Sequence, residues 1–205
     1  SLVDTVTTDE QLAAIEGMTD LETLLLSRTK ITGEGLKHLR GLTNLKKLML
    51  DDTAVDDVGL KWLASLKNLR ELNLRNTRVT GAGMPALGQL TSLEKLNLEN
   101  TAVDSQGLAA LASLTRLFDL DLEATAVTDD GLAHLASLSS LEALDLRRTA
   151  VTDQAVDALR AIPRLKRVWL LGSRATQRGV KRLEELRPDV RIIDGSKTDA
   201  ARPIP

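Results

Sequence analysis

The 205-residue sequence contains no cysteine and only three aromatic residues, two tryptophans and one phenylalanine. The absence of cysteine excludes disulfide bonds, thiolate metal ligands and cysteine nucleophiles, and it leaves the compartment open. No apolar run approaches the roughly 20 residues that a membrane-spanning helix needs. The formal net charge of −2 provides no overall basic field that would attract nucleic acid or an anionic membrane.

The start of the chain also lacks the features of a signal peptide. Because the chain opens at Ser1 rather than at a methionine, we expect it to be trimmed or excised from a longer protein. Any targeting segment would then lie outside it. The sequence therefore leaves both a cytoplasmic location and secretion as an effector open.

What the sequence does contain is a 24-residue pattern that repeats seven times without a gap from Leu21 to Pro188. Each copy opens with aliphatic residues spaced L-x-x-L-x-L, as in Leu93, Leu96 and Leu98. A threonine (or, once, a serine), a Val or Ile, a Thr or Asp, a small residue (glycine in six of the copies) and an apolar triple follow in order. A fixed period of this length indicates a stacked repeat array, so we predict one elongated unit.

Two local patterns predict what one repeat looks like. The segment 71–75 alternates leucine with polar residues, which predicts a strand, and apolar residues spaced by three in 107–114 predict one or two helical turns. An oxygen-bearing side chain precedes each predicted helix and should cap its first amides. These predicted N-caps are Thr32, Asp56, Thr80, Asp104, Thr128, Thr152 and Thr176. The small residue three positions later is glycine except at Ala155, so we expect the position to require small size.

One strand and one short helix per repeat predict a parallel sheet on one side of the array and helices on the other. Strands lie about 4.8 Å apart and helices are about 10 Å wide, so the array should curve with its strands on the concave side. We expect residues 1–20 to form an N-terminal partial repeat that acts as a cap, residues 21–188 the seven repeats, and residues 189–205 a last strand and a tail.

The pattern L-x-x-L-x-L-x-x-T-x-V-T-D-x-G-L resembles the leucine-rich repeat family, and it is similar to bacterial 24-residue, ribonuclease-inhibitor-like and GALA-type repeats. This resemblance implies an α/β fold, a right-handed horseshoe-shaped solenoid that binds proteins. The family usually has Asn or Cys where this chain has threonine. We interpret the threonines as a structural ladder along the stack, and the alternative of a phosphorylation or ligand array stays open. They are Thr29, Thr53, Thr77, Thr101, Thr125 and Thr149.

The sequence offers little catalytic chemistry. His38 and His134 occupy equivalent positions four repeats apart, about 19 Å from each other, so they cannot share a metal or a proton. Acidic residues gather on the predicted strands around Asp121, and such a cluster could bind a divalent cation or supply a general acid. Because that face should be open to water and Arg147 lies within reach, we interpret the cluster as an acidic recognition patch. We predict no enzyme, no metal and no cofactor.

The outward strand positions vary between repeats while the core positions stay the same, so we predict that this face binds a polypeptide partner. The mixed charge of the face disfavours nucleic acid, and we expect neither membrane binding nor oligomerisation. Trp169 is either an anchor for the partner or covered by the C-terminal tail through Ile204. The predicted partner-binding residues are Asn73, Arg75, Asn97, Glu99, Phe118, Asp119, Asp121, Glu123, Asp145, Arg147, Arg167 and Trp169.

Two alternative functions stay open. The similarity to GALA-type repeats implies a substrate-recognition arm of a bacterial effector that acts in host ubiquitin ligation, although no F-box segment is visible. A metal-dependent enzyme that uses the acidic strand cluster is the other alternative.

Overall fold

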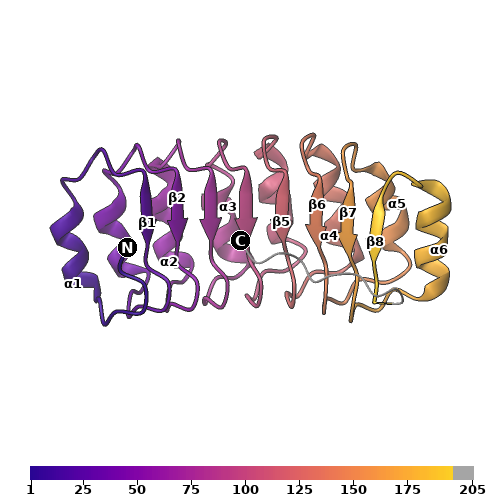
Figure 1. The fold of residues 1–205 in the computed structure, drawn as a ribbon, viewed down its shortest axis with the longest axis horizontal. Helices are drawn as coiled ribbons and strands as arrows, with labels where there is room; N and C mark the ends of the chain where they lie inside the picture. The colour runs from indigo at the N-terminus through magenta and orange to yellow at the C-terminus, as the bar shows by residue number, and fades with distance from the viewer. Residues whose placement is uncertain (196–205) are drawn as a thin grey trace.

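The computed structural model describes residues 1–195 as a single row of stacked repeats (Figure 1). Eight strands form one parallel sheet in which every strand pairs with its neighbours in sequence order. Residues 24 apart are direct partners, as Leu72 and Leu96 are, so the register predicted from the repeat is confirmed. The strands are β1 (Thr23–Leu25), β2 (Lys47–Met49), β3 (Glu71–Asn73), β4 (Lys95–Asn97), β5 (Asp119–Asp121), β6 (Ala143–Asp145), β7 (Arg167–Trp169) and β8 (Arg191–Ile193).

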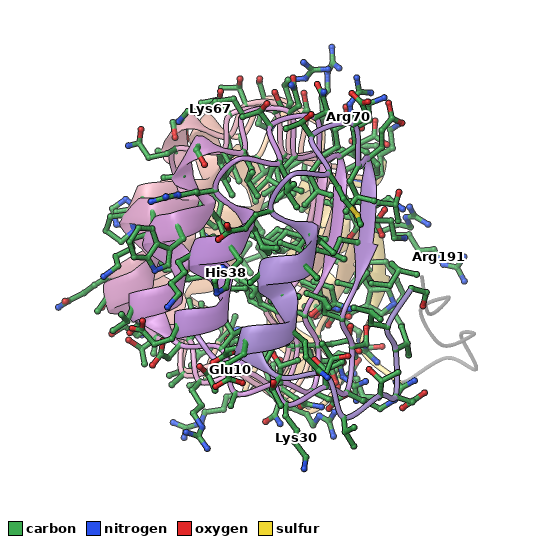
Figure 2. The ribbon with its side chains drawn as sticks, turned by 90° about the vertical axis from the view of Figure 1, so that its left-hand side faces the viewer. Glu10, Lys30, His38, Lys67, Arg70 and Arg191 are labelled. Atoms are coloured by element: carbon green, nitrogen blue, oxygen red, sulfur yellow. The ribbon has the colours of Figure 1, made fainter. Side chains whose placement is uncertain are left out.

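Short helices return the chain from each strand to the next and lie together on the opposite side of the molecule (Figure 2). The α-helices are α1 (Asp9–Leu12), α2 (Asp57–Leu60), α3 (Met84–Leu87), α4 (Asp129–Leu132), α5 (Ala155–Ala161) and α6 (Gln177–Leu186). The 3₁₀-helices are η1 (Ala13–Ile15), η2 (Glu34–Leu39), η3 (Lys61–Ser65), η4 (Gly81–Gly83), η5 (Gly107–Ser113) and η6 (Ala133–Ser137). Within residues 1–195, every helix is too short or too polar to cross a bilayer.

The repeated aliphatic residues fill the space between the sheet and the helices (Figure 2). Leu96 of β4 and Leu108 of η5 are at most 1 % exposed, and the equivalent leucines along the stack are at most 5 % exposed. They belong to one continuous core that runs through all repeats. No single repeat encloses its own leucines, so each depends on its neighbours for burial.

In six of the seven repeats the side chain of the predicted N-cap accepts a hydrogen bond from a backbone N–H two or three positions later, although the helices after Thr32, Asp104 and Thr152 begin later than predicted. Asp56 accepts a hydrogen bond from the backbone N–H of Gly59, and Thr176 accepts one from that of Arg178. Thr128 is the exception, because its side chain makes no cap hydrogen bond and instead contacts the hydroxyl of Ser105. The remaining caps that bond as predicted are Thr32, Thr80, Asp104 and Thr152.

The small residue of each repeat lies where neighbouring coils touch. A Cβ atom added to Gly59 would lie only 2.4 Å from the Cα atom of Gly33 in the preceding coil. Gly59 does not have a positive φ, and Ala155 occupies the equivalent position in a later repeat. Small size is therefore the requirement, as predicted.

The buried threonine row has a structural role that differs in detail from the predicted one. The hydroxyl of Thr29 donates to the carbonyl of Leu26 at 2.7 Å, and that of Thr53 donates to the carbonyl of Leu50 at 2.6 Å. Each bond stays inside its own repeat, so the prediction of a ladder along the stack was wrong. The hydroxyls close the turn that follows each strand.

A ladder does connect three neighbouring repeats one residue earlier, at a position that the sequence analysis did not single out. The side-chain amide of Asn100 donates to Asn76 at 2.6 Å, and that of Asn76 donates to Asp52 at 2.5 Å. The residue here has a left-handed backbone in every repeat. Its φ values lie between 53° and 74° at Arg28, Asp52, Asn76, Asn100, Ala124, Arg148 and Gly172.

Ala124 is strained at this position, because its φ of 55° brings its Cβ atom close to the backbone and it has no polar side chain to compensate. We expect Ala124→Gly to raise the free energy of unfolding by about 0.5–1 kcal/mol, since glycine adopts this conformation without a steric penalty. Urea denaturation would measure the change. Ala126→Gly is the matched control two residues away, where φ is not positive, and it should lower stability instead.

Candidate functional site

The face of the sheet that points away from the helices, which we call the strand face, carries three columns of side chains. Direct pairing of neighbouring strands aligns the first two columns. The first contains Thr23, Lys47, Glu71, Lys95, Asp119, Ala143 and Arg167. The middle column contains Leu25, Met49, Asn73, Asn97, Asp121, Asp145 and Trp169, and the third contains Ser27, Asp51, Arg75, Glu99, Glu123, Arg147 and Leu171.

The acids and amides of the middle column hold the ends of their strands. The side-chain oxygen of Asn97 accepts a hydrogen bond from the backbone N–H of Glu99 at 2.8 Å. Asn73, Asp121 and Asp145 each make the same bond to the residue two positions later, at 3.0 Å. This Asx turn satisfies a backbone donor where the strand ends. The Asn and Asp residues of this column therefore share a role in the fold. This role was not predicted from the sequence.

Five of the twelve predicted partner-binding residues are buried, contrary to the expectation of an open face. Their exposed fractions are 9 % or less at Asn73, Asp121, Glu123, Asp145 and Trp169. Trp169 packs with Ala143 and Ile193 of the neighbouring strands. The proposed cover of Trp169 by the segment through Ile204 lies outside the described residues. These five side chains offer little area to a partner.

The buried carboxylates of Asp121, Glu123 and Asp145 have oxygen atoms within 4.8 Å of one another. Arg147 lies against two of them, with Nη2 2.5 Å from Glu123 and 2.7 Å from Asp145, and Arg148 forms an ion pair with Glu123. This group, the acidic cluster, is therefore enclosed and bound to guanidinium groups, and the prediction of a water-exposed patch was wrong.

The electrostatics of the acidic cluster are visible in the pKa of Arg147. Burial disfavours the charged guanidinium, but the hydrogen bond to Asp145 and the charges of Asp145, Glu123 and Asp121 outweigh it, so the pKa of Arg147 is raised. Arg147 stays charged and compensates the carboxylates at any pH at which they are ionised. The arrangement is that of an ion-pair cluster that supports the fold.

The accessible part of the strand face lies beside these buried groups. Half-exposed side chains there form ion pairs between neighbouring strands, Lys47 with Glu71 at 2.8 Å and Arg75 with Glu99 at 3.0 Å. A hollow of about 30 Å³ opens between β2 and β5. It is lined by Met49, Glu71, Leu72, Asn73, Lys95, Leu96, Asn97 and Asp119. Of the predicted residues, Arg75, Asn97, Glu99, Phe118, Asp119, Arg147 and Arg167 retain exposed surface.

The two histidines lie on the helical side, as the sequence predicted. His38 is half-buried and contacts the carboxylate of Glu16 through Nδ1, and His134 is exposed on η6. They belong to different repeats and lie away from the acidic cluster on the strands. The structure brings no histidine to the strand face within residues 1–195.

The leucine rich repeat family matches residues 43–103 of the sequence, which include strands β2 to β4 and the L-x-x-L-x-L leucines of each. This segment belongs to the leucine-rich-repeat family, and residues 1–195 continue the same stacked architecture. Leucine-rich-repeat proteins generally mediate protein–protein interaction and generally are not enzymes. No curated protein sequence matches this chain.

Solved structures with the same fold include internalin C2 from Listeria monocytogenes, at 26 % identity and a TM-score of 0.74. That match covers 94 % of this chain and 78 % of the internalin. A leucine-rich-repeat protein from Leptospira interrogans matches at 19 % identity and a TM-score of 0.64, over 88 % of this chain and 50 % of its own. The plant peptide hormone receptor RGFR1, in complex with RGF2, matches at 17 % identity and a TM-score of 0.62. That match covers 89 % of this chain and 29 % of the receptor chain.

Proposed function

We propose that the chain binds another protein through the accessible part of its strand face. The observation that carries the proposal is the contrast between an unvarying leucine scaffold and a row of half-exposed side chains that differ from repeat to repeat. A scaffold with a continuous core is already ordered before binding, so association costs little conformational entropy. The plant receptor complex is a precedent for a leucine-rich-repeat fold that binds another molecule.

The charge pattern of the strand face favours a polypeptide partner. Cations and carboxylates alternate across the strands, as in the pairs Lys47–Glu71 and Arg75–Glu99, so no continuous basic track exists for a phosphate backbone. Phe118 is half-buried with the ammonium group of Lys95 over its ring at 5.9 Å, and it provides an aromatic contact beside the hollow. Aromatic and arginine side chains dominate the affinity of protein interfaces.

We expect Phe118→Ala and Glu99→Arg each to weaken binding of the partner by at least about tenfold, which corresponds to ~1.4 kcal/mol. The partner is first captured on the immobilised wild-type chain from an extract of the source organism. The dissociation constant is then measured by biolayer interferometry for wild type and each variant. Thermal melting of each variant tests that the fold is kept.

Matched controls lie on the helical side of an earlier repeat. Val58 and Lys61 are exposed there, so Val58→Ala and Lys61→Glu should leave the affinity unchanged. A loss of binding with these two variants and full binding with the strand-face variants would overturn the proposal. Capture of a protein that none of the four variants affects would overturn it as well.

A further inference from the structure

The charge of the molecule is distributed very unevenly along the stack. Residues 155–195, from the start of α5 to the last described residue, contain ten Lys or Arg and five Asp or Glu, a net charge of +5. Residues 1–154 contain fifteen Lys or Arg and twenty-three Asp or Glu, a net charge of −8. The overall charge of −2 therefore conceals a basic end, which we define as residues 155–195.

The cations of the basic end are largely exposed and have few counter-ions. Nine of the ten are exposed, Arg187 being the exception. Arg160, Arg164, Arg174 and Lys181 form no ion pair with a described residue, and the basic end holds only five acids for its ten cations. An excess of positive charge at one end of the molecule disfavours the isolated fold, and an oppositely charged partner would relieve that repulsion.

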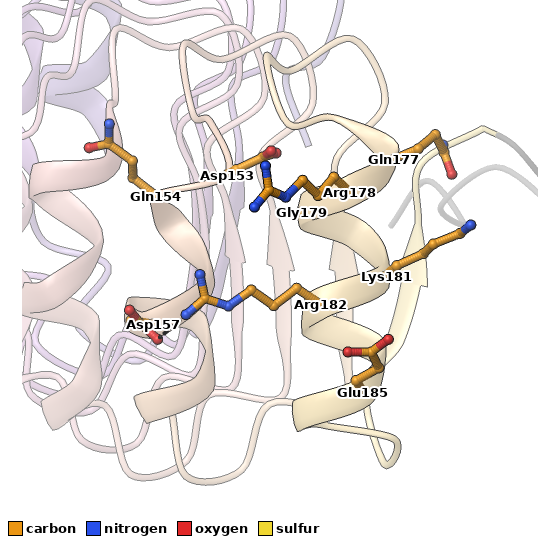
Figure 3. Close-up of a pocket in the computed structure, with 9 residues that line it drawn as sticks. All are labelled: Asp153, Gln154, Asp157, Gln177, Arg178, Gly179, Lys181, Arg182 and Glu185. Carbon is orange, nitrogen blue, oxygen red and sulfur yellow. Dashed lines mark ion pairs between the residues drawn. The ribbon is translucent and has the colours of Figure 1, made fainter.

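A recess of about 890 Å³ lies in the basic end between α5 and α6 (Figure 3). Arg178 and Arg182 extend from α6 toward α5, and Arg182 reaches Asp157 at 3.7 Å. Both members of that pair are more than half exposed, so the contact contributes little stability and can open at small cost. Lys181, Gln154, Gln177 and Glu185 complete the lining together with Asp153 and Gly179.

We propose that the basic end is a second docking surface, in which the recess between α5 and α6 binds an acidic polypeptide segment. Carboxylates of the segment would pair with Arg178 and Arg182 between the helices and with Lys181 on the other side of α6, and the amide of Gln154 would bond its backbone. The recess is built from α5 and α6 and the residues before them, and none of its lining residues belongs to the strand face, so it does not depend on the function proposed above.

A polypeptide fits these observations better than other anionic partners. Three acids line the recess beside its three cations, namely Asp153, which accepts hydrogen bonds from Thr176, together with Asp157 and Glu185. They would repel an unbroken row of phosphates while leaving room for spaced carboxylates. A second copy of the chain is a less favourable occupant, because three acids of its N-terminal end already contact cations of the same chain. Asp4, Glu16 and Glu22 contact Arg28, His38 and Lys46 of the same chain.

The test uses the full chain and a fluorescent peptide in which glutamate alternates with serine, with binding followed by fluorescence anisotropy. Wild type should bind the peptide, and binding should weaken as salt rises from about 0.05 to 0.3 M. The triple variant Arg178→Glu, Lys181→Glu, Arg182→Glu should lose at least about tenfold in affinity. The corresponding triple glutamine variant removes the three positive charges without adding negative ones that repel the peptide, so its loss of affinity should be smaller. It also tests whether the loss in the glutamate variant comes from charge rather than from misfolding.

The matched control is Lys30→Glu, Lys37→Glu, Arg40→Glu, which changes the net charge equally at three exposed residues near the other end. This variant should bind the peptide as wild type does. Equal loss in both triple variants, or no binding by wild type, would overturn the proposal. So would tighter binding to single-stranded DNA or to phosphatidylserine vesicles, or self-association in sedimentation that the α6 variant abolishes.

Discussion

Leu96→Ala should lower the free energy of unfolding by about 2–5 kcal/mol. Leu96 is 1 % exposed at the centre of β4, and it belongs to the core that all repeats share. Removing three carbon atoms there takes away buried apolar surface and leaves a cavity that the rigid stack cannot close. Its strand neighbours Leu72 and Leu120 lose a contact on each side.

Urea denaturation followed by circular dichroism would measure this loss. Leu96→Met is the control, since it keeps the volume of the side chain and should cost less than about 1.5 kcal/mol. Each repeat contacts only its neighbours, so a weakened repeat can unfold before the rest of the stack. The urea unfolding transition of Leu96→Ala should therefore be broader than that of Leu96→Met. A cost no larger than that of the methionine variant would contradict the continuous core.

The scaffold could be predicted from the sequence because packing determines it. The leucine spacing, the cap residue before each helix and the small residue at Gly59 recur every 24 positions, and each repeat imposes the same steric demand. Periodicity therefore reports the core and the strand register directly. It does not report helix type, and the structure mixes α and 3₁₀ turns from one repeat to the next.

The strand face could be predicted only in part. The change from Asn73 and Asn97 to Asp121 and Asp145 suggested that the fold does not constrain this position. In the structure each of these side chains accepts a hydrogen bond from the backbone N–H at the end of its strand, and that bond needs only an oxygen acceptor. Asn and Asp satisfy that demand equally, so variation in sequence hid a shared role. The left-handed column escaped prediction for the same reason, since Arg28 and Ala124 adopt the conformation alongside Asn and Gly.

Arg147→Met should lower the free energy of unfolding by about 3–5 kcal/mol, because it removes the cation from a buried group of carboxylates. Arg147 donates through Nε to both oxygens of Asp145, at 3.0 and 2.9 Å, and pairs with Glu123 through Nη2. The side chains of Asp145 and Glu123 are only 0 % and 6 % exposed, so water cannot replace the lost partner. Chemical denaturation at neutral pH would measure the loss.

Arg75→Met provides the matched control, because Arg75 occupies the same column three repeats earlier and pairs with Glu99 at 3.0 Å. The side chain of Arg75 is 43 % exposed, against 22 % for Arg147, so its loss should cost no more than about 1 kcal/mol. Adding Glu123→Gln to Arg147→Met should recover part of the stability by removing one of the three buried carboxylates that repel one another. Equal costs at the two arginines, or no recovery in the double variant, would mean that the acidic cluster does not depend on Arg147 for its compensation.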